Sequence, residues 1–381
     1  MANSNANLKE GAKAAPAAFA AFEKLEAFMR DVFIKVGVPA EDAAVCAEVL
    51  IESDKRGIDS HGIGRFKPIY IDRIKDGIQN PVTNFEIVRE GPTTAVIDGH
   101  DGMGQVVGKR AMQMTVDKAK KYGMGMAVVR NSTHYGIAGF YATMATKAGM
   151  IGLTGTNARP SIAPTFGVEN MLGTNPLTVG IPSDEDFPFV LDCATSVSQR
   201  GKIEHYERIS KQMPPGWVID REGRSETDPS VALVGFNKGT HALAPLGGIG
   251  DETAGYKGYG YATVVEILSA ALQQGHFLKA LTGLDESGKK IPYGLGHFFI
   301  AIDISAFVEL DKFKRTTGDI LRELRASVKM PGRDRIYTAG ELEYLAWLDR
   351  KDAGVPLNDS LKKTIKTLKE EYGLTQYEFD F

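Results

Sequence analysis

Cysteine is scarce in this 381-residue sequence, which contains only Cys46 and Cys193. The two cysteines are far apart and no CxxC pair occurs, so neither a disulfide framework nor a thiolate zinc site is indicated. A chain with so few thiols fits a reducing compartment, and we expect a cytoplasmic protein without a metal site.

Long hydrophobic runs are also missing. No apolar stretch approaches the ~20 residues that span a bilayer, and residues 1–21 have neither a secretory core nor an arginine-rich amphipathic face. Glu10 and the missing arginines disfavour an organelle-targeting role for this start of the chain. We therefore expect no membrane partner, and a flexible tail over residues 1–21.

The sequence has no strong excess of either charge, because 45 basic and 48 acidic residues leave a formal net charge of -3. This balance gives no electrostatic reason to expect nucleic acid as a partner. With 43% hydrophobic residues the chain can bury a large core. The expected partners are a small molecule and a second copy of the chain.

The hydrophobic pattern predicts alternating strands and helices. Apolar residues recur at helical spacing over 22–57 with a break at 37–39, which predicts a helical hairpin. Further along we expect strands at 94–98, 125–129, 150–154, 177–181, 189–191 and 298–302, and helices at 106–119, 139–148 and 262–274, before a lysine- and glutamate-rich helical tail. This alternation indicates an α/β protein.

A glycine-rich segment at residues 102–108, GMGQVVG, follows one predicted strand and opens a helix, as a phosphate-binding turn does. Its spacing is GxGxxxG, and the next strand ends at Arg130 where an acid for the ribose is expected, although arginine would suit a 2′-phosphate. A tight turn whose glycines allow close helix packing is the interpretation that we favour.

Two histidine segments carry stronger chemical information, DSHGIGR at 59–65 and NSTHYG at 131–136. Imidazole titrates near neutrality, so His61 or His134 could take the proton of an alcohol and return it. Arg65 offers a planar pair of donors that matches a carboxylate. A single histidine is more often a structural hydrogen-bonding residue than a catalyst, so each alone proves little.

Other chemistries remain open on these residues. A serine hydrolase using Ser60 or Ser132 lacks a GxSxG elbow, and adjacent residues of a strand point to opposite faces. A zinc enzyme using both histidines lacks HExxH and a thiolate pair. A non-catalytic protein that only binds carboxylates is a third alternative.

From about residue 22 to residue 340 the sequence resembles the malate/L-lactate dehydrogenase family of the non-Rossmann type, which also has ureidoglycolate, sulfolactate and cyclic-imine-reducing members. The motifs that carry the resemblance are DSHGIGR at 59–65, NSTHYGIAGFYA at 131–142, GTNPLTVGIP at 173–182, LDCATS at 191–196, PLGG at 245–248, GYKGYG at 255–260 and MPG at 330–332. Their order and combination make chance agreement very unlikely.

The resemblance implies an α/β fold that is not doubly wound, with a large mixed sheet for the cofactor and a helical domain formed by the chain ends. It places a helical region with the first motif at 22–90, the cofactor and substrate domain at 91–310 and a helical region at 311–381. It also implies that the glycine segment at 102–108 does not bind the dinucleotide.

By similarity the cofactor-binding residues are Asn157, Thr174, Asn175, Asp192, Cys193, Ala194, Thr195, Tyr256, Lys257, Gly258, Pro331, Gly332 and Arg333. Gly255 and Gly258 would let the backbone approach phosphates, Lys257 would supply a countercharge, and a helix from about Ala262 would point its positive end toward them. Many family members carry glutamate where this chain has Arg333, so the chain departs from the family pattern at this contact. NAD is the expected cofactor, with NADP as the alternative.

On the substrate side, the resemblance places His61 and His134 at the active site, and His134 is the slightly favoured acid/base. Arg65 and Ser60 would bind substrate, with Arg65 on its carboxylate, and Arg159 would bind a second carboxylate. The implied enzyme is a homodimeric oxidoreductase that moves a hydride between NAD(P) and C2 of a 2-hydroxy acid, with (S)-malate and oxaloacetate as the expected pair. L-Lactate, sulfolactate and ureidoglycolate are the alternative substrates.

Overall fold

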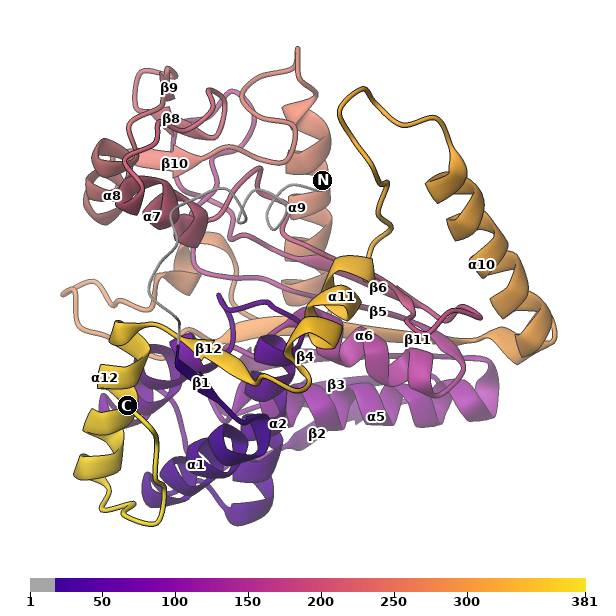
Figure 1. Ribbon diagram of the computed structural model, residues 1–381, viewed down its shortest axis with the longest axis horizontal. Coiled ribbons are helices and arrows are strands. Elements are labelled where there is room, and N and C mark those ends of the chain that lie inside the picture. The colour runs from indigo at the N-terminus through magenta and orange to yellow at the C-terminus, as the bar shows by residue number, and fades with distance from the viewer. Residues whose placement is uncertain (1–17) are drawn as a thin grey trace.

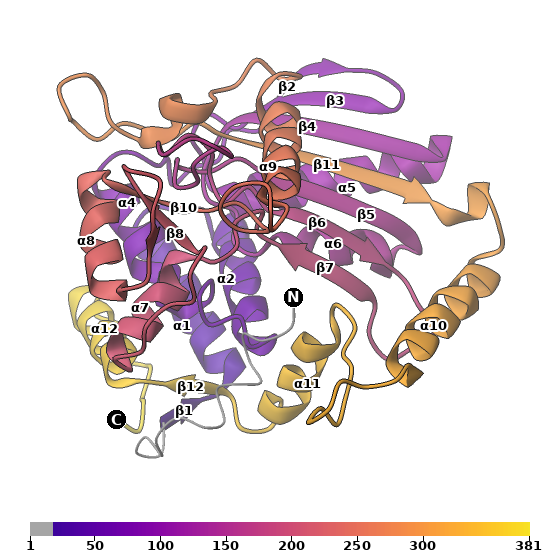
Figure 2. The same ribbon diagram turned by 90° about the horizontal axis from the view of Figure 1, so that it is seen from above.

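The computed structural model describes residues 18–381 and is built around one seven-stranded sheet. Figure 2 shows its strands side by side in the order β2-β3-β4-β11-β5-β6-β7. Their bounds are β2 Glu86–Glu90, β3 Thr94–Asp98, β4 Met124–Ser132, β5 Met150–Thr156, β6 Leu177–Ile181, β7 Phe189–Cys193 and β11 Leu295–Asp303. The six strands expected from the sequence are all present, and each occurs at or around its predicted position.

Only one neighbouring pair in this sheet is parallel, namely β3 and β4, which are joined by a helix. Every other pair is antiparallel, including β11, which lies between β4 and β5 and pairs with both. A doubly wound fold requires a mostly parallel sheet. The mixed sheet therefore confirms the fold class that the resemblance implies.

Helices cover the two faces of the sheet unequally. α5 (Gly104–Tyr122) and α6 (Ala138–Lys147) lie along one face, and α9 (Gly255–Ala270) crosses part of the other (Figure 1). The face under α5 and α6 holds a buried core that includes Val129, Tyr141 and Phe299. The positions of α5 and α6 agree with the predicted helices at 106–119 and 139–148.

The chain ends meet in a helical region beside the sheet. The hairpin of α1 (Phe22–Lys35) and α2 (Ala40–Lys55) packs with α12 (Asp359–Glu371) around one hydrophobic core. Two short strands, β1 (Ala18–Ala20) and β12 (Val355–Leu357), pair antiparallel and tie the ends together (Figure 1). Residues 18–20 of the expected tail thus form a strand, and residues 1–17 lie outside the described part of the chain.

The proline-punctuated middle of the sequence forms a smaller unit on one end of the sheet. A three-stranded sheet in the order β10-β8-β9 packs with α7 and α8. The bounds are β8 Val218–Asp220, β9 Ser225–Glu226, β10 His241–Leu243, α7 Arg200–Arg208 and α8 Pro229–Lys238. Asp228 accepts hydrogen bonds from two N–H groups at the start of α8, directly before Pro229, which explains why that helix begins there.

The remaining helices are α3 Ile63–Arg65, a π-helical turn Phe66–Ile71, α4 Asp72–Lys75, α10 Leu310–Ala326 and α11 Glu341–Arg350, with 3-10 turns at Leu278–Thr282 and Ile304–Ala306. One predicted helix needs correction, because α9 begins at Gly255 rather than Ala262 and ends at Ala270 rather than near Gln274. The glycines that suggested a loop instead allow close packing, since a Cβ at Gly258 would collide with the backbone of Leu246. Within residues 18–381, no helix is both long and apolar enough to cross a bilayer.

Candidate active site

The two histidine motifs meet in the structure. His61 lies in the turn before α3, His134 follows the end of β4, and their ring centroids are 5.7 Å apart with the planes inclined by 20°. Both side chains are half-buried, so each ring keeps surface that a ligand can reach. Ser60 lies in the same turn as His61 and Arg65 ends α3, and Arg65 donates from Nε to the backbone oxygen of Ser60 over 2.7 Å.

His134 is held through one of its ring nitrogens. The Tyr70 hydroxyl lies 2.6 Å from Nδ1 of His134, and the backbone N–H of Gly136 donates to the same nitrogen over 3.2 Å. A backbone N–H can only donate, so Nδ1 is the acceptor and the proton of the neutral ring is on Nε2. His134 therefore presents an N–H donor on its remaining nitrogen.

The glycine segment at 102–108 supports His134 from behind. Gly104 donates its N–H to Oγ1 of Thr133 over 3.0 Å, and a Cβ at Gly104 would collide with the backbone carbonyls of Thr133 and His134. Thr133 in turn donates to the carbonyl of Gly102 over 2.7 Å. The glycines thus allow close backbone packing, in agreement with the favoured interpretation of the sequence, and Arg130 is paired with Asp98 at 2.8 Å.

The turn that carries His61 is fixed by a buried carboxyl group. Asp54, at the end of α2, accepts the N–H of Ile63 over 2.8 Å, and a Cβ at Gly62 would collide with its carboxyl group. Burial raises the pKa of Asp54 to about 8 against the opposing effect of that N–H. Ser60 Oγ and His61 Nδ1 are 2.9 Å apart and share a hydrogen bond, which leaves Nε2 of His61 for other contacts.

Burial and positive charge keep both imidazoles neutral near pH 7. Burial, followed by the charge of Arg65, lowers the pKa of His61 to about 4. Burial also lowers the pKa of His134 well below its usual value, and His61, Arg73 and Arg65 lower it further. The site is therefore electropositive around two neutral rings.

Three site residues escaped the sequence analysis: Tyr70, Arg73 and Asp54. Arg73 follows Tyr70 by three residues in the helical stretch, a spacing that puts side chains on one face, but this signal becomes useful only once Tyr70 is known to contact His134. Nothing in the sequence marks Tyr70 or Asp54, because their partners are distant or lie in a turn of unknown geometry. Arg159, predicted from sequence, is solvent-exposed, and its charge acts on Arg73.

The expected cofactor residues fall into two structural classes. In the first class, the side chains make hydrogen bonds to other parts of the protein, although Oδ1 of Asn175 has no partner among residues 18–381. Asn157 and Asn175 are fully buried: Asn157 bridges the backbone of His276 and Gly296, and Asn175 donates to Ala262 and Glu266. Buried Thr195 donates to the carbonyls of Asn175 and Thr174.

Asp192, Cys193 and Ala194 lie along and just beyond β7. Asp192 is an exposed residue whose carboxyl group is nevertheless packed against the protein; it accepts the N–H of Gly139 over 2.6 Å and the Thr178 hydroxyl over 2.9 Å. Burial raises the pKa of Asp192, although both hydrogen bonds oppose the shift. Asp192 thereby supports the first turn of α6, which has no acidic residue of its own. Cys193 and Ala194 are half-buried, and Cys46 and Cys193 are both free thiols.

The second class is exposed. Tyr256 and Lys257 lie in the first turn of α9, with the Lys257 ammonium 5.8 Å from the Tyr256 ring centroid. α9 has no side-chain N-cap and no acidic residue in its first turn. Its leading N–H groups therefore have few protein partners, which suits an anion. Gly258 is the buried member of this segment.

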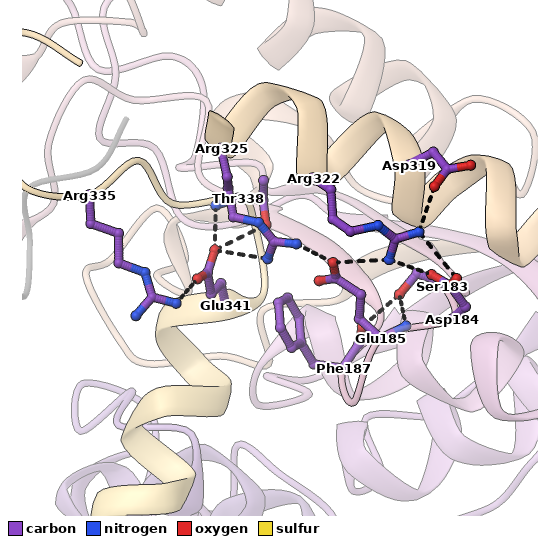
Figure 3. A network of polar contacts seen from close by, with 10 residues as sticks. All are labelled: Ser183, Asp184, Glu185, Phe187, Asp319, Arg322, Arg325, Arg335, Thr338 and Glu341. Carbon is purple, nitrogen blue, oxygen red and sulfur yellow. Dashed lines mark hydrogen bonds and ion pairs between the residues drawn. The ribbon is translucent and has the colours of Figure 1, made fainter. Parts of the chain in front are cut away.

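Residues Pro331, Gly332 and Arg333 are exposed on the segment between α10 and α11. In the described part of the chain, no hydrogen bond or ion pair joins these three residues to the histidines or to α9. A polar network fixes both ends of the segment, because Arg325 before it and Arg335 after it both contact buried Glu341 (Figure 3). Across residues 18–381 no three or more His, Cys, Asp or Glu side chains are grouped so that they could hold a metal ion.

Comparison with known proteins gives consistent similarities. A family model described as malate/L-lactate dehydrogenase matches residues 20–366. The malate dehydrogenase of Pyrococcus horikoshii is 42% identical over 352 residues, covering 92% of this chain and 95% of that protein. The L-sulfolactate dehydrogenase of Methanocaldococcus jannaschii is 40% identical over 346 residues, covering 90% and 94%. The crystal structure of malate dehydrogenase from Entamoeba histolytica has a TM-score of 0.91 and 45% identity, covering 96% of this chain and all of that one.

Proposed function

This chain belongs to the malate/L-lactate dehydrogenase family and is a dehydrogenase of 2-hydroxy acids, and we propose that its substrate pair is (S)-malate and oxaloacetate. Several similar proteins are named malate dehydrogenase, which supports malate over L-lactate, sulfolactate or ureidoglycolate. The observation that carries the proposal is the meeting of two neutral imidazoles with guanidinium groups at one accessible place.

The hydrogen bonds of the two histidines suggest different roles for them. In malate oxidation, His61 takes the 2-hydroxyl proton on Nε2 while its Nδ1–H bonds to Ser60. His134 donates its Nε2–H to the same substrate oxygen, because Tyr70 and Gly136 occupy its Nδ1. The C2 hydrogen leaves with its electron pair as hydride, so the C2–O bond becomes a carbonyl. A general base of this kind contributes ~10²–10⁴-fold to the rate.

Arg65 would bind the C1 carboxylate and so orient C2 toward the two rings. The incoming anion would also change the proton affinity of the site. Because the arginine charges help to lower the pKa of both histidines, a bound carboxylate that offsets those charges raises the pKa of His61 toward neutrality. Substrate binding would thus prepare the base for proton transfer.

NAD is the cofactor that we propose, and it would supply the hydride acceptor at its nicotinamide ring. The uncapped first turn of α9 suits its pyrophosphate, with Lys257 as a countercharge and Tyr256 beside it. Buried Asn157, Asn175 and Thr195 and half-buried Thr174 would shape this region from beneath, together with the segment Asp192–Ala194. Pro331–Arg333 would contact the cofactor from the segment after α10.

A homodimer is the assembly that we propose. Exposed apolar side chains follow one line along α10 and the segment after it, at Ile320, Leu324 and Val328. Such a line in contact with a second copy would remove apolar surface from water. Light scattering after size exclusion tests this assembly. The two free thiols are consistent with a cytoplasmic protein, which fractionation of cells would test.

The experiment that tests the function assays the purified protein with NADH and NADPH against oxaloacetate, pyruvate, sulfopyruvate and oxalurate, with and without a chelator. We expect the highest kcat/KM with oxaloacetate and NADH, unchanged by the chelator. A higher kcat/KM with another 2-oxo acid would show that malate is not the preferred substrate. Faster oxidation of NADPH than of NADH would show that NADP is the preferred cofactor. Loss of turnover in chelator would support the zinc alternative.

A further inference from the structure

Arg73 occupies an unusual position beside the histidine site. It lies in α4, directly after the π-helical turn that carries Tyr70, and its guanidinium carbon is 4.4 Å from the centroid of the Tyr293 ring. The side chain is half-buried. Stacking on an aromatic face fixes the plane of the guanidinium and leaves the N–H groups at its edge free to bind a planar anion.

No carboxylate neutralises this arginine or its two neighbours. Among residues 18–381, no Asp or Glu oxygen lies within 4 Å of a guanidinium nitrogen of Arg65, Arg73 or Arg159. Arg159 and Arg65 are nevertheless close enough to Arg73 that both lower its pKa, behind the larger effect of burial. Like charges held together without a counterion favour an anionic ligand.

We propose that Arg73 binds the distal anionic group of the substrate and so makes the enzyme select dianionic 2-hydroxy acids. Arg65 would hold the carboxylate on C1, next to the reacting carbon. Arg73 would hold the second anion, a C4 carboxylate or a C3 sulfonate, and exposed Arg159 would contact it from the solvent side. This assignment rests on the proposed dehydrogenase function and adds the residue that determines its substrate class.

The position of Arg73 relative to His134 agrees with this role. Tyr70 contacts His134 directly, and Arg73 follows Tyr70 by three residues, just after the π-helical turn passes into α4. The charge of Arg73 also contributes to the low pKa of His134. A dianion held between Arg65 and Arg73 therefore passes beside the ring that donates to the C2 oxygen.

The first test compares Arg73→Gln with the wild type on oxaloacetate, sulfopyruvate and pyruvate. Loss of one charge-assisted contact lowers kcat/KM for the two dianions by ~10²-fold, and for pyruvate by much less, so the ratio of oxaloacetate to pyruvate falls by ~30-fold. Arg73→Lys recovers part of the ratio. Arg89→Gln, on exposed β2 and in no ion pair, is the matched control and leaves the ratio unchanged.

Equal losses on oxaloacetate and pyruvate, or no loss on either, would overturn the role of Arg73. A selective loss in Arg159→Gln without one in Arg73→Gln would transfer the role to Arg159. Calorimetric titration of succinate and acetate in the presence of NADH provides a readout that does not need turnover. If the wild type reduces none of the 2-oxo acids, the proposed dehydrogenase function fails. Even then, succinate binding that is tighter than acetate binding and disappears in Arg73→Gln would support the anion site. Equal binding of succinate and acetate by the wild type would refute the anion site.

Discussion

Arginine serves two different purposes in two regions of this molecule. On α10, Arg322 contacts both carboxylate oxygens of Asp184 at 3.0 and 3.2 Å and also Asp319, while Arg325 contacts Glu185 (Figure 3). Around the histidines, Arg65, Arg73 and Arg159 have no such partners among residues 18–381. The same side chain is therefore part of the scaffold in one place and available to a ligand in the other.

This difference teaches where function is to be sought in such a fold. A charged group whose hydrogen bonds are all made inside the protein fixes one element against another. A partly buried charge without a protein partner costs free energy that a ligand can recover. The comparison predicts that changes at the histidine site alter rate and specificity, and that changes in the α10–α11 network alter stability.

The largest effect is expected for His61→Asn, which removes the proposed proton acceptor. We expect kcat to fall by ~10³-fold with little change in NADH binding, because the contacts of the base are made to the reacting oxygen. Stopped-flow kinetics and NADH fluorescence measure the two quantities. His205→Asn on α7 is the control. If His134→Gln is inactive and His61→Asn keeps wild-type kcat, the two roles are exchanged.

Glu341→Ala should act on the other side of the comparison. Glu341 is 1% exposed and accepts from Arg335, from Arg325 and from the N–H of Thr338 at 3.0 Å. We expect the free energy of unfolding in urea to fall by about 2 kcal/mol, because the arginines lose a buried partner. kcat with oxaloacetate should stay within about twofold. Glu309→Ala is the control, because it removes an exposed ion pair with Lys312, and it should change neither the free energy of unfolding nor kcat measurably. A large fall in kcat without loss of stability would contradict the assignment of Glu341 to the scaffold.

Asp54→Asn tests a group that lies in the histidine site but has its partners inside the protein. The folded pKa of about 8 exceeds the ordinary value of 3.8, so from about pH 4 to pH 8 the unfolded carboxyl is ionised while the folded one keeps its proton. Wild-type stability relative to Asp54→Asn should therefore fall as the pH rises through this window, by roughly 3–4 kcal/mol between pH 5 and pH 8. Urea titrations at both pH values measure it. A difference that is independent of pH would refute the raised pKa, and Asp352→Asn on the surface is the control.

Tyr70→Phe should have the smallest effect, because it keeps the buried ring and removes only the hydroxyl that contacts Nδ1 of His134. We expect kcat to fall about fivefold, which corresponds to the loss of one neutral hydrogen bond, while the melting temperature changes little. Tyr344→Phe, whose hydroxyl bonds to Asp186 near the surface, is the control. A loss as large as that of His61→Asn would mean that Tyr70 itself transfers the proton.

Much of the local structure could be predicted from the sequence, because helices and strands leave periodic patterns in neighbouring residues. The hairpin of α1 and α2 and the strand at Thr94–Asp98 appear where the pattern placed them. The predicted start of α9 was wrong, because glycines that usually end a helix are needed here for contact with the backbone of Leu246. That contact joins distant segments and leaves no local signal.

The candidate active site also has a part that could be predicted from the sequence and a part that could not. The motifs identify His61, His134 and Arg65 as reactive residue types, and their family resemblance identifies the reaction, so the sequence by itself determined the chemistry. Only the tertiary structure decided that β11 lies between β4 and β5, that Tyr70 contacts His134, and that the side-chain amides of Asn157 and Asn175 donate to the backbone carbonyls of His276 and Ala262. The physical reason is that residue chemistry is local, whereas the partner that occupies a polar group, or leaves it for a ligand, arrives from elsewhere in the chain.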